Sequence, residues 1–213
     1  MRVFRANGVW TERGLLEDHT VVVAQTGVIT EVRPARAGDG PALDGWLVPG
    51  LVNAHTHVER TGPIALGGQG LAAWVDDSVG PEGDADAGAA ELFAVGTAVV
   101  SDISNAGDTG EALAAHGVDG VVQHEFIGHD PLRSSDALER IRTFQSDGPL
   151  VVRPAAHGPH STAADVLVAA LTYPSAHPAS IHLAEHEDES DFLLDGSGPF
   201  AELLARWGVD TRR

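Results

Sequence analysis

The spacing of apolar residues changes near residue 47. Before that point, β-branched residues at 21–23 and 28–32 flank Gln25-Thr26-Gly27. Short β-branched runs around a turn predict a pair of antiparallel strands. A stretch rich in Pro, Gly and Asp follows at 34–43. We therefore expect residues 1–46 to form a small antiparallel β unit and residues 47–213 to form a second domain.

From residue 47 onward, apolar strand-like runs alternate with Ala-rich helical patterns. The predicted strands are 48–54, 98–103, 120–126, 150–155 and 179–183. The predicted helices are 70–78, 89–95, 109–116, 135–145 and 162–171. This alternation predicts an α/β fold with a parallel sheet. The acidic, Gly-rich stretch 76–87 has no periodicity and predicts a surface loop.

Chemically capable side chains lie at the carboxyl end of each predicted strand. In strand order they are His55 with His57, Asn105, His124 with Glu125, His157, and His182 with Glu185. In a (β/α) barrel, the carboxyl ends of the strands share one face, and the active site lies there. The pattern therefore predicts one site built from all five strands.

Composition removes several classes of function. The formal net charge is −18, which disfavours binding to nucleic acids and to anionic membranes. All 13 basic residues are Arg and there is no Cys, so lysine Schiff bases and thiolate chemistry are excluded. The N-terminus lacks an apolar signal region, and no apolar run is long enough to span a bilayer. We expect a cytoplasmic protein with a small-molecule substrate.

His55-Thr56-His57 is the first candidate for metal chemistry. In an extended segment, side chains two residues apart point to the same side. Two imidazoles can then converge on one divalent cation at the ~2.0–2.1 Å that is typical of Zn–N bonds. The alternative is a surface or packed pair of histidines.

The sequence around these histidines resembles a known family. VPGLVNAHTH, at 48–57, resembles the first-strand signature of the amidohydrolase superfamily, PG-hydrophobic-hydrophobic-(N/D)-x-H-x-H. SIHLAE, at 180–185, resembles the fifth-strand HxAE signature of its mononuclear aminohydrolase branch, and Asp102 to Asn105 lies where the second strand ends. That branch deaminates guanine, triazines, adenosine-like nucleosides and aminodeoxyfutalosine.

The resemblance implies a fold and a metal site. The fold is a (β/α)8 TIM-like barrel, of which this chain carries about the first five β/α units, after part of a small β-sandwich. His55, His57 and His182 match ligands of one divalent metal, with Zn²⁺ the default and Fe²⁺ the alternative. Glu185 matches the proton shuttle. The absence of Lys fits the mononuclear branch, because other branches bridge two metals with a carboxylated lysine.

The substrate-side residues are less completely matched. HGPHS, at 157–161, resembles the family's HAPY(S/T) stretch, so His157 matches a substrate-binding histidine, while His160 replaces the Tyr. His124 and Asn105 are further substrate-binding candidates from their places at strand ends. Residues 186–189 are expected to form a solvated helix start.

The implied reaction is hydrolytic deamination of an aminated heteroaromatic or nucleoside-like small molecule. Hydrolysis of a cyclic amide or of a ring carbon–chlorine bond is the alternative within enzymes. The chain leaves room for about five of eight units at roughly 30 residues each. The family's sixth-strand His and eighth-strand Asp have no match, which predicts a truncated part of a longer enzyme. The other alternative is a non-catalytic metal-binding half-barrel, whose open sheet edge favours a homo-oligomer or a partner chain.

Overall fold

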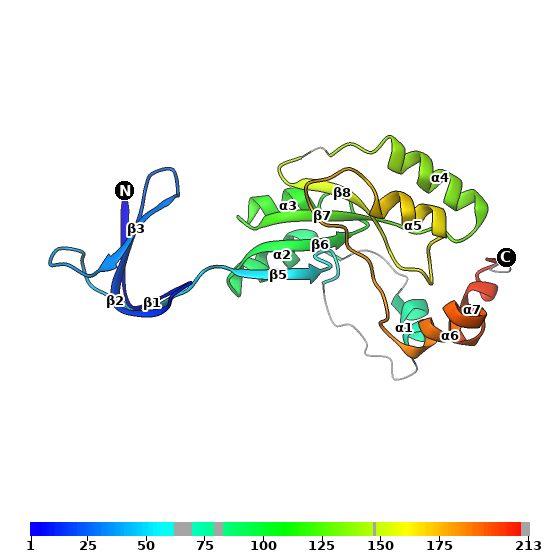
Figure 1. Cartoon of the computed structure of the whole chain (residues 1–213), viewed down its shortest axis with the longest axis horizontal. Helices are drawn as coiled ribbons and strands as arrows, with labels where there is room; N and C mark the ends of the chain where they lie inside the picture. Colours follow the sequence, from blue (N-terminus) through cyan, green and yellow to red (C-terminus); the bar gives the residue numbers. More distant parts are fainter. Residues whose placement is uncertain (62–69, 79–82, 147, 210–213) are drawn as a thin grey trace. The chain divides into compact units, whose positions relative to one another are not determined.

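The computed structural model describes residues 1–61, 70–78, 83–146 and 148–209. The chain divides into two compact units, Met1–Leu51 and Val52–Arg213 (Figure 1). Within the described residues, no helix combines the length and apolar character needed to cross a membrane.

The first unit is a single four-stranded sheet. Its strands are β1 (Arg2–Thr11), β2 (Gly14–Val23), β3 (Ile29–Pro34) and β4 (Leu43–Leu47), in the order β3-β2-β1-β4. The β1, β2 and β3 strands pair antiparallel as predicted, but β4 pairs parallel with β1, so the unit is not wholly antiparallel. The sequence predicted no strand over the residues of β4.

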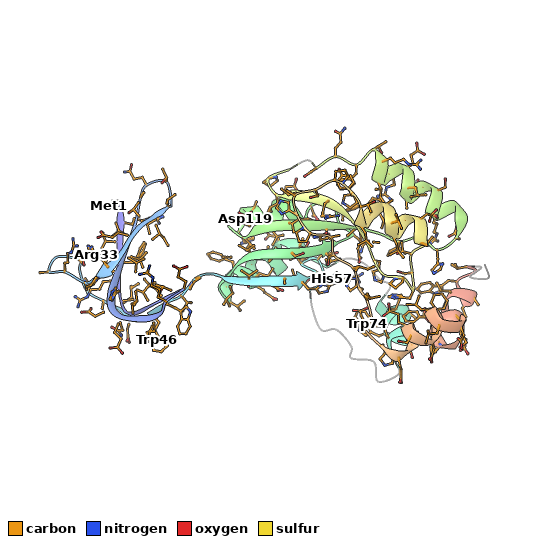
Figure 2. The ribbon with its side chains drawn as sticks, viewed as in Figure 1. Met1, Arg33, Trp46, His57, Trp74 and Asp119 are labelled. Atoms are coloured by element: carbon orange, nitrogen blue, oxygen red, sulfur yellow. The ribbon has the colours of Figure 1, made fainter. Side chains whose placement is uncertain are left out.

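The connection between β3 and β4 is fixed by one carboxylate. Asp39 accepts hydrogen bonds from both terminal nitrogens of Arg33, at 2.6 and 2.7 Å, and from Thr20 Oγ1 at 3.0 Å. The Arg33 guanidinium holds the pKa of the Asp39 carboxyl well below its usual range. Two parallel hydrogen bonds between one guanidinium and one carboxylate fix the geometry of the loop. Figure 2 labels Arg33 on this unit.

The second unit is built on a parallel sheet. Its strands are β5 (Leu51–Thr56), β6 (Thr97–Ser104), β7 (Asp119–Phe126) and β8 (Val151–Ala156), in the order β5-β6-β7-β8. The alternating helices are α1 (Leu71–Ser78), α2 (Ala85–Ala94), α3 (Thr109–Ala115), α4 (Pro131–Arg142) and α5 (Ala164–Leu171). Two further helices follow, α6 (Glu187–Asp195) and α7 (Gly198–Arg206). Four of the five predicted barrel strands and all five predicted helices are confirmed, with shifts of a few residues at their ends.

Apolar side chains on one face of the sheet are covered by the helices. One core cluster joins α2 and α3 to β6 and β7, and includes Leu113, Val100 and Val122. A second joins α4 and α5 to the ends of β7 and β8, around Phe126 and Val166. Helices α1, α6 and α7 gather separately beyond the carboxyl ends of the strands (Figure 1), around the buried ring of Phe200.

A glycine brings α2 against the segment that follows β5. A Cβ atom at Gly88 would lie 2.1 Å from the carbonyl oxygen of Val58, so no larger residue fits without a shift. This contact places the helix directly under Val58. The chain immediately before Val58 is therefore held against a rigid element.

The fifth predicted strand does not form. Residues 179–183 are extended but are not paired as a strand with β8. One backbone hydrogen bond joins them to the chain after β8, from His182 N to the carbonyl oxygen of His157 at 2.8 Å. The carbonyl oxygens of His177 and Pro178 instead accept hydrogen bonds from side chains of β8 and β7. An apolar, alternating pattern gives strand propensity, but a strand also needs a paired neighbour along its length.

Two further expectations need correction. The predicted loop 76–87 overlaps the end of α1 and the start of α2, and residues 79–82 of it lie outside the described part of the chain. Residues 186–189 do start a helix, but they are not all solvated, because Asp188 and Glu189 are buried. Both carboxylates accept backbone N–H groups, from Ala72 and Glu185 respectively, which accounts for their burial.

The packing between α3 and the sheet gives a direct test of this fold. Leu113 is completely buried, so Leu113→Ala should lower the free energy of unfolding by about 2–5 kcal/mol. Leu194 is 86% exposed on α6, so Leu194→Ala should change that free energy by less than about 0.5 kcal/mol. Urea unfolding followed by circular dichroism measures both. Equal effects of the two substitutions would contradict the described core.

Candidate metal centre

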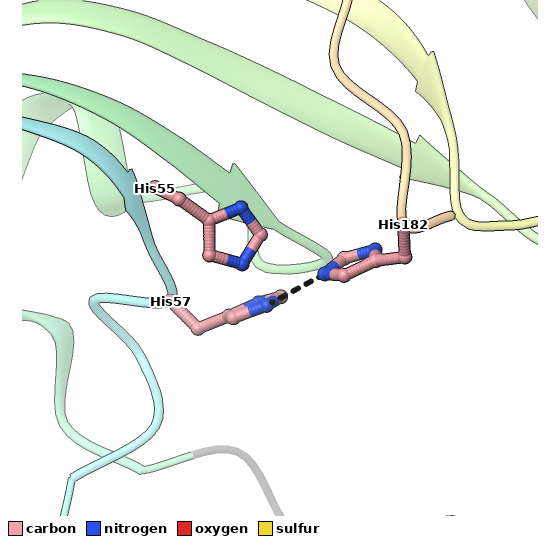
Figure 3. A group of neighbouring side chains, drawn as sticks. All are labelled: His55, His57 and His182. Carbon is pink, nitrogen blue, oxygen red and sulfur yellow. Dashed lines mark hydrogen bonds between the residues drawn. The ribbon is translucent and has the colours of Figure 1, made fainter. Parts of the chain in front are cut away.

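Three imidazoles converge at the carboxyl end of β5. His55 and His57 come from the end of β5, and His182 comes from the extended segment after α5 (Figure 3). The Nε2 atoms of His57 and His182 lie 3.2 Å apart, and the ring centroid of His55 is 5.2 Å and 4.9 Å from those of His57 and His182. One nitrogen from each ring lies within 4.8 Å of the others. The three predicted metal ligands are therefore brought together.

The ring of His182 is oriented by the backbone of His157. Its Nδ1 lies 3.1 Å from the carbonyl oxygen of His157, which also accepts the backbone N–H of His182. A carbonyl oxygen only accepts, so Nδ1 carries the proton of this hydrogen bond. The Nε2 lone pair then points toward His57, as in histidines whose second nitrogen is held by a protein acceptor.

Electrostatics keeps the β5 histidines neutral. Burial lowers the pKa of His57 to about 4, and burial together with the nearby His182 lowers the pKa of His55. Neutral imidazole is the form that binds a metal. His182 differs, because the effect of burial on its pKa is outweighed by Glu125, whose Oε1 lies 3.3 Å from Nδ1, and its pKa is raised.

The donor set fits a divalent cation. For bonds of ~2.0–2.1 Å, two ligand atoms of a tetrahedral zinc site are separated by about 3.3–3.4 Å. The 3.2 Å between the Nε2 atoms of His57 and His182 is close to that separation. Three imidazole nitrogens suit zinc, and also iron. The residues present therefore match the kind of metal that the sequence predicts.

Glu125 belongs to the site, as its place at a strand end predicted, although the sequence favoured its neighbour His124 as the substrate-binding candidate. It is buried, and its Oε2 accepts a hydrogen bond from Asn105 Nδ2 at 2.9 Å. Although burial raises its pKa, the hydrogen bond with His182 and the charges of His157 and His182 outweigh burial and lower the pKa to about 2. Glu125 also groups with His157 and His182 as possible metal-binding atoms. The lowered pKa and the 3.3 Å distance from Oε1 to His182 Nδ1 make Glu125 an ionised partner of the ligand ring.

His124 lies on the opposite side of β7 from Glu125. Its ring packs on Phe126 and Phe144, and its Nε2 lies 3.4 Å from Arg140 Nη2. Adjacent residues of a strand point to opposite faces, so only one of the two can reach the histidine cluster. The apolar neighbours Val122 and Phe126 share the face of His124, and this alternation is the signal that would have selected Glu125.

Two buried carboxylates fix the chain around His57 and Asn105. Asp102 Oδ1 accepts the backbone N–H of Val58 at 2.8 Å, and Glu59 Oε1 accepts that of Asn105 at 3.1 Å. Burial raises the pKa of both groups, that of Asp102 to about 7. The end of β5 and the end of β6 are thus joined by side-chain hydrogen bonds. The predicted candidate Asn105 lies next to the cluster through its contact with Glu125.

His157 and His160 have different surroundings. The ring of His157 lies 4.9 Å from that of His182, and its Nδ1 is 2.6 Å from Ser161 Oγ. Burial lowers its pKa to about 4. His160 is fully buried and stacks on Phe200, and its ring centroid lies 5.1 Å from that of His157. Of the two, only His157 adjoins the candidate ligands.

Glu185 is exposed near the cluster. Its charge raises the pKa of His55 and His182, and its backbone N–H donates to Glu189 Oε2 at 3.0 Å. The preceding residue, Ala184, has a φ of 59°, in the left-handed region that non-glycine residues rarely adopt. The chain therefore turns sharply between the ligand His182 and Glu185.

A cavity of about 530 Å³ opens at the carboxyl end of β7, between that strand and α4; it meets the site through Asn105 and Glu125, and none of the three histidines lines it. Its lining includes Asn105 and Glu125 from the site, together with Phe126, Arg133 and Arg140. Small-molecule sites have volumes of about 300–1,000 Å³ and combine apolar walls with a few polar groups. The cavity is large enough for a heterocyclic substrate.

The solved structures that this chain resembles in fold are enzymes. No protein-family model and no curated protein matches the sequence. An aminofutalosine deaminase from Helicobacter pylori, in complex with methylthio-coformycin, aligns with 97% of this chain at a TM-score of 0.71 and 20% identity. An amidohydrolase from Brucella melitensis aligns with 97% of the chain at a TM-score of 0.60 and 20% identity. An adenosine deaminase from Xanthomonas campestris with bound zinc aligns with 97% of the chain at a TM-score of 0.57 and 23% identity.

The chain has an amidohydrolase fold. This likeness confirms the predicted fold class. The chain spans 56%, 57% and 55% of the lengths of these three structures, which agrees with the predicted match to an N-terminal portion of such a protein. At these identities the likeness concerns the fold alone.

The raised pKa of Asp102 predicts how the stability of the metal-free protein depends on pH. Because the folded state holds this proton more tightly than the unfolded state, the free energy of unfolding should fall as pH rises from about 4 to about 7, by up to about 4 kcal/mol. Asp102→Asn should remove most of this fall. Denaturant unfolding between pH 4 and 8, with a chelator present, measures it. An unchanged slope in the variant would contradict the assignment to Asp102.

Proposed function

We propose that the chain is the N-terminal part of a metal-dependent hydrolase that deaminates an aminated heteroaromatic or nucleoside-like small molecule. The observation that carries the proposal is the convergence of His55, His57 and His182 at the carboxyl end of a parallel sheet, with the Nε2 atoms of His57 and His182 3.2 Å apart. The fold likeness to deaminases and triazine hydrolases supports the same reaction class. In this proposal residues 1–46 are part of a small β-sandwich and residues 47–213 are part of the barrel.

His55, His57 and His182 hold the metal in this proposal, with zinc the default ion. A divalent cation supplies Lewis acidity there and lowers the pKa of a contacting water to ~7. Glu125 and the His157 carbonyl keep the His182 ring in its ligand orientation. The cavity excludes bulk water from part of the substrate and sets its position.

Glu185 moves the proton. Its carboxylate takes a proton from the attacking water and delivers it to the ring nitrogen next to the amino-bearing carbon. It then carries the remaining proton of the added hydroxyl to the amino group, so that the carbon–nitrogen bond breaks and ammonia leaves as the carbonyl forms. His157, with its Nδ1 held by Ser161, is positioned to contact the substrate ring. Asn105 lines the same cavity, and His124 reaches it from the other side of β7.

Metal dependence is the first test of this function. For protein isolated from its native source, ammonia release from a panel of aminopurines, aminopyrimidines and aminotriazines should disappear after chelation and return with Zn²⁺. The panel also includes cyclic amides and chlorinated triazines, so that ring opening or chloride release would reassign the leaving group. His182→Ala should reduce turnover by more than about 10³-fold, because it removes a metal ligand. Ammonia release that survives both treatments would overturn the proposal.

Glu185→Gln separates proton transfer from metal binding. The variant should bind Zn²⁺ as the wild type does, since Glu185 is not among the three converging nitrogen ligands, but should lose about 10²–10⁴-fold in kcat. Glu187→Gln, an exposed carboxylate two residues away, is the matched control and should keep full activity. Equal activities of the two variants would remove Glu185 from the mechanism.

A further inference from the structure

The segment that carries His182 is held by side chains in place of a strand ladder. At its beginning, the carbonyl oxygen of His177 accepts Arg153 Nη1 at 2.6 Å, and that of Pro178 accepts Gln123 Nε2 at 3.1 Å. At its end, His182 bonds to the His157 carbonyl. Five residue steps, at most about 18 Å of extended chain, separate His177 from His182.

Arg153 is an unusual residue for this place. It is only 2% exposed, and it forms no ion pair within the described part of the chain. Its other donors reach the carbonyl oxygens of Ala170 at 3.0 Å and Pro154 at 3.2 Å. Burying a guanidinium costs free energy unless its N–H groups have acceptors. The three carbonyl oxygens must therefore stay in place around Arg153 for it to remain buried.

Gln123 and Arg153 form one layer of the sheet. They are directly paired across β7 and β8, and Gln123 is 1% exposed. Side chains two residues apart on a strand share a face, so Gln123 shares its face with Glu125. The face that anchors the His177–Pro178 backbone therefore also carries the carboxylate that contacts His182.

We propose that Arg153 and Gln123 are positioning residues for the metal centre, and that they set the place of His182 by anchoring the start of its segment. This inference rests on the proposed metal site. Without these two anchors, the start of the segment loses its contacts with the sheet, and His182 is held at the far end by His157 and Glu125. The His182 ring can then move relative to His55 and His57. A displaced ring weakens the binding of the metal.

Zn²⁺ affinity of the 213-residue chain, measured by competition with a chromogenic chelator, tests the proposal. Arg153→Met removes the donors at similar length and should lower the affinity about 10-fold or more. Arg153→Lys keeps a charge and some donors, and should give an intermediate loss. The absorption spectrum of bound Co²⁺ should change in the Met variant, because the ligand geometry changes.

A core variant provides the matched control. Leu113→Ala destabilises the fold without touching the segment, so it should leave Zn²⁺ affinity unchanged at temperatures where it is folded. If Arg153→Met does not fold, Gln123→Met, which removes one hydrogen bond, should lower affinity several-fold. Wild-type affinity in the folded Arg153 and Gln123 variants, or an equal loss in Leu113→Ala, would overturn the inference. Wild-type affinity in His182→Ala would instead reject the metal site itself, so the two failures are distinct.

Discussion

The carbonyl oxygen of His157 is the acceptor on which the site depends. It takes two hydrogen bonds from His182, one from the backbone N–H and one from Nδ1 of the ring. The first fixes where the residue lies, and the second fixes which nitrogen faces His57. A single group just after β8 therefore holds the end of the segment and sets the tautomer of a candidate ligand that lies outside any regular strand.

Because side chains alternate along a strand, one face of the sheet packs against the helices and the other carries the residues of the candidate site. On β7, Val122, His124 and Phe126 face the helices and their apolar cores, while Gln123 and Glu125 face the histidine cluster. A shift of one residue in register would exchange these sets, placing a carboxylate in an apolar core. The pairing of β7 with its neighbours is therefore fixed by the same residues that build the site.

The sequence predicted what local pattern and motif can determine. Apolar runs located β5 to β8, and the spacing of His55 and His57, with the motif around His182, located three side chains that do converge. Strand propensity at 179–183 did not predict that this segment would stay unpaired, because pairing depends on neighbours distant in sequence. The burial of Glu189 could not be predicted either, since its partner is the backbone N–H of Glu185 on a turn with a left-handed residue.

Three buried acidic residues have a structural role at the carboxyl edge of the sheet. Backbone N–H groups in the loops there have no strand partner, and each needs an acceptor. Buried carboxylates supply it: Asp102 for Val58, Glu59 for Asn105, and Glu189 for Glu185. Each of these amides belongs to, or directly follows, a residue of the candidate site. These three acids therefore act on the backbone around the histidines, because each gives a backbone N–H group the acceptor that it would otherwise lack.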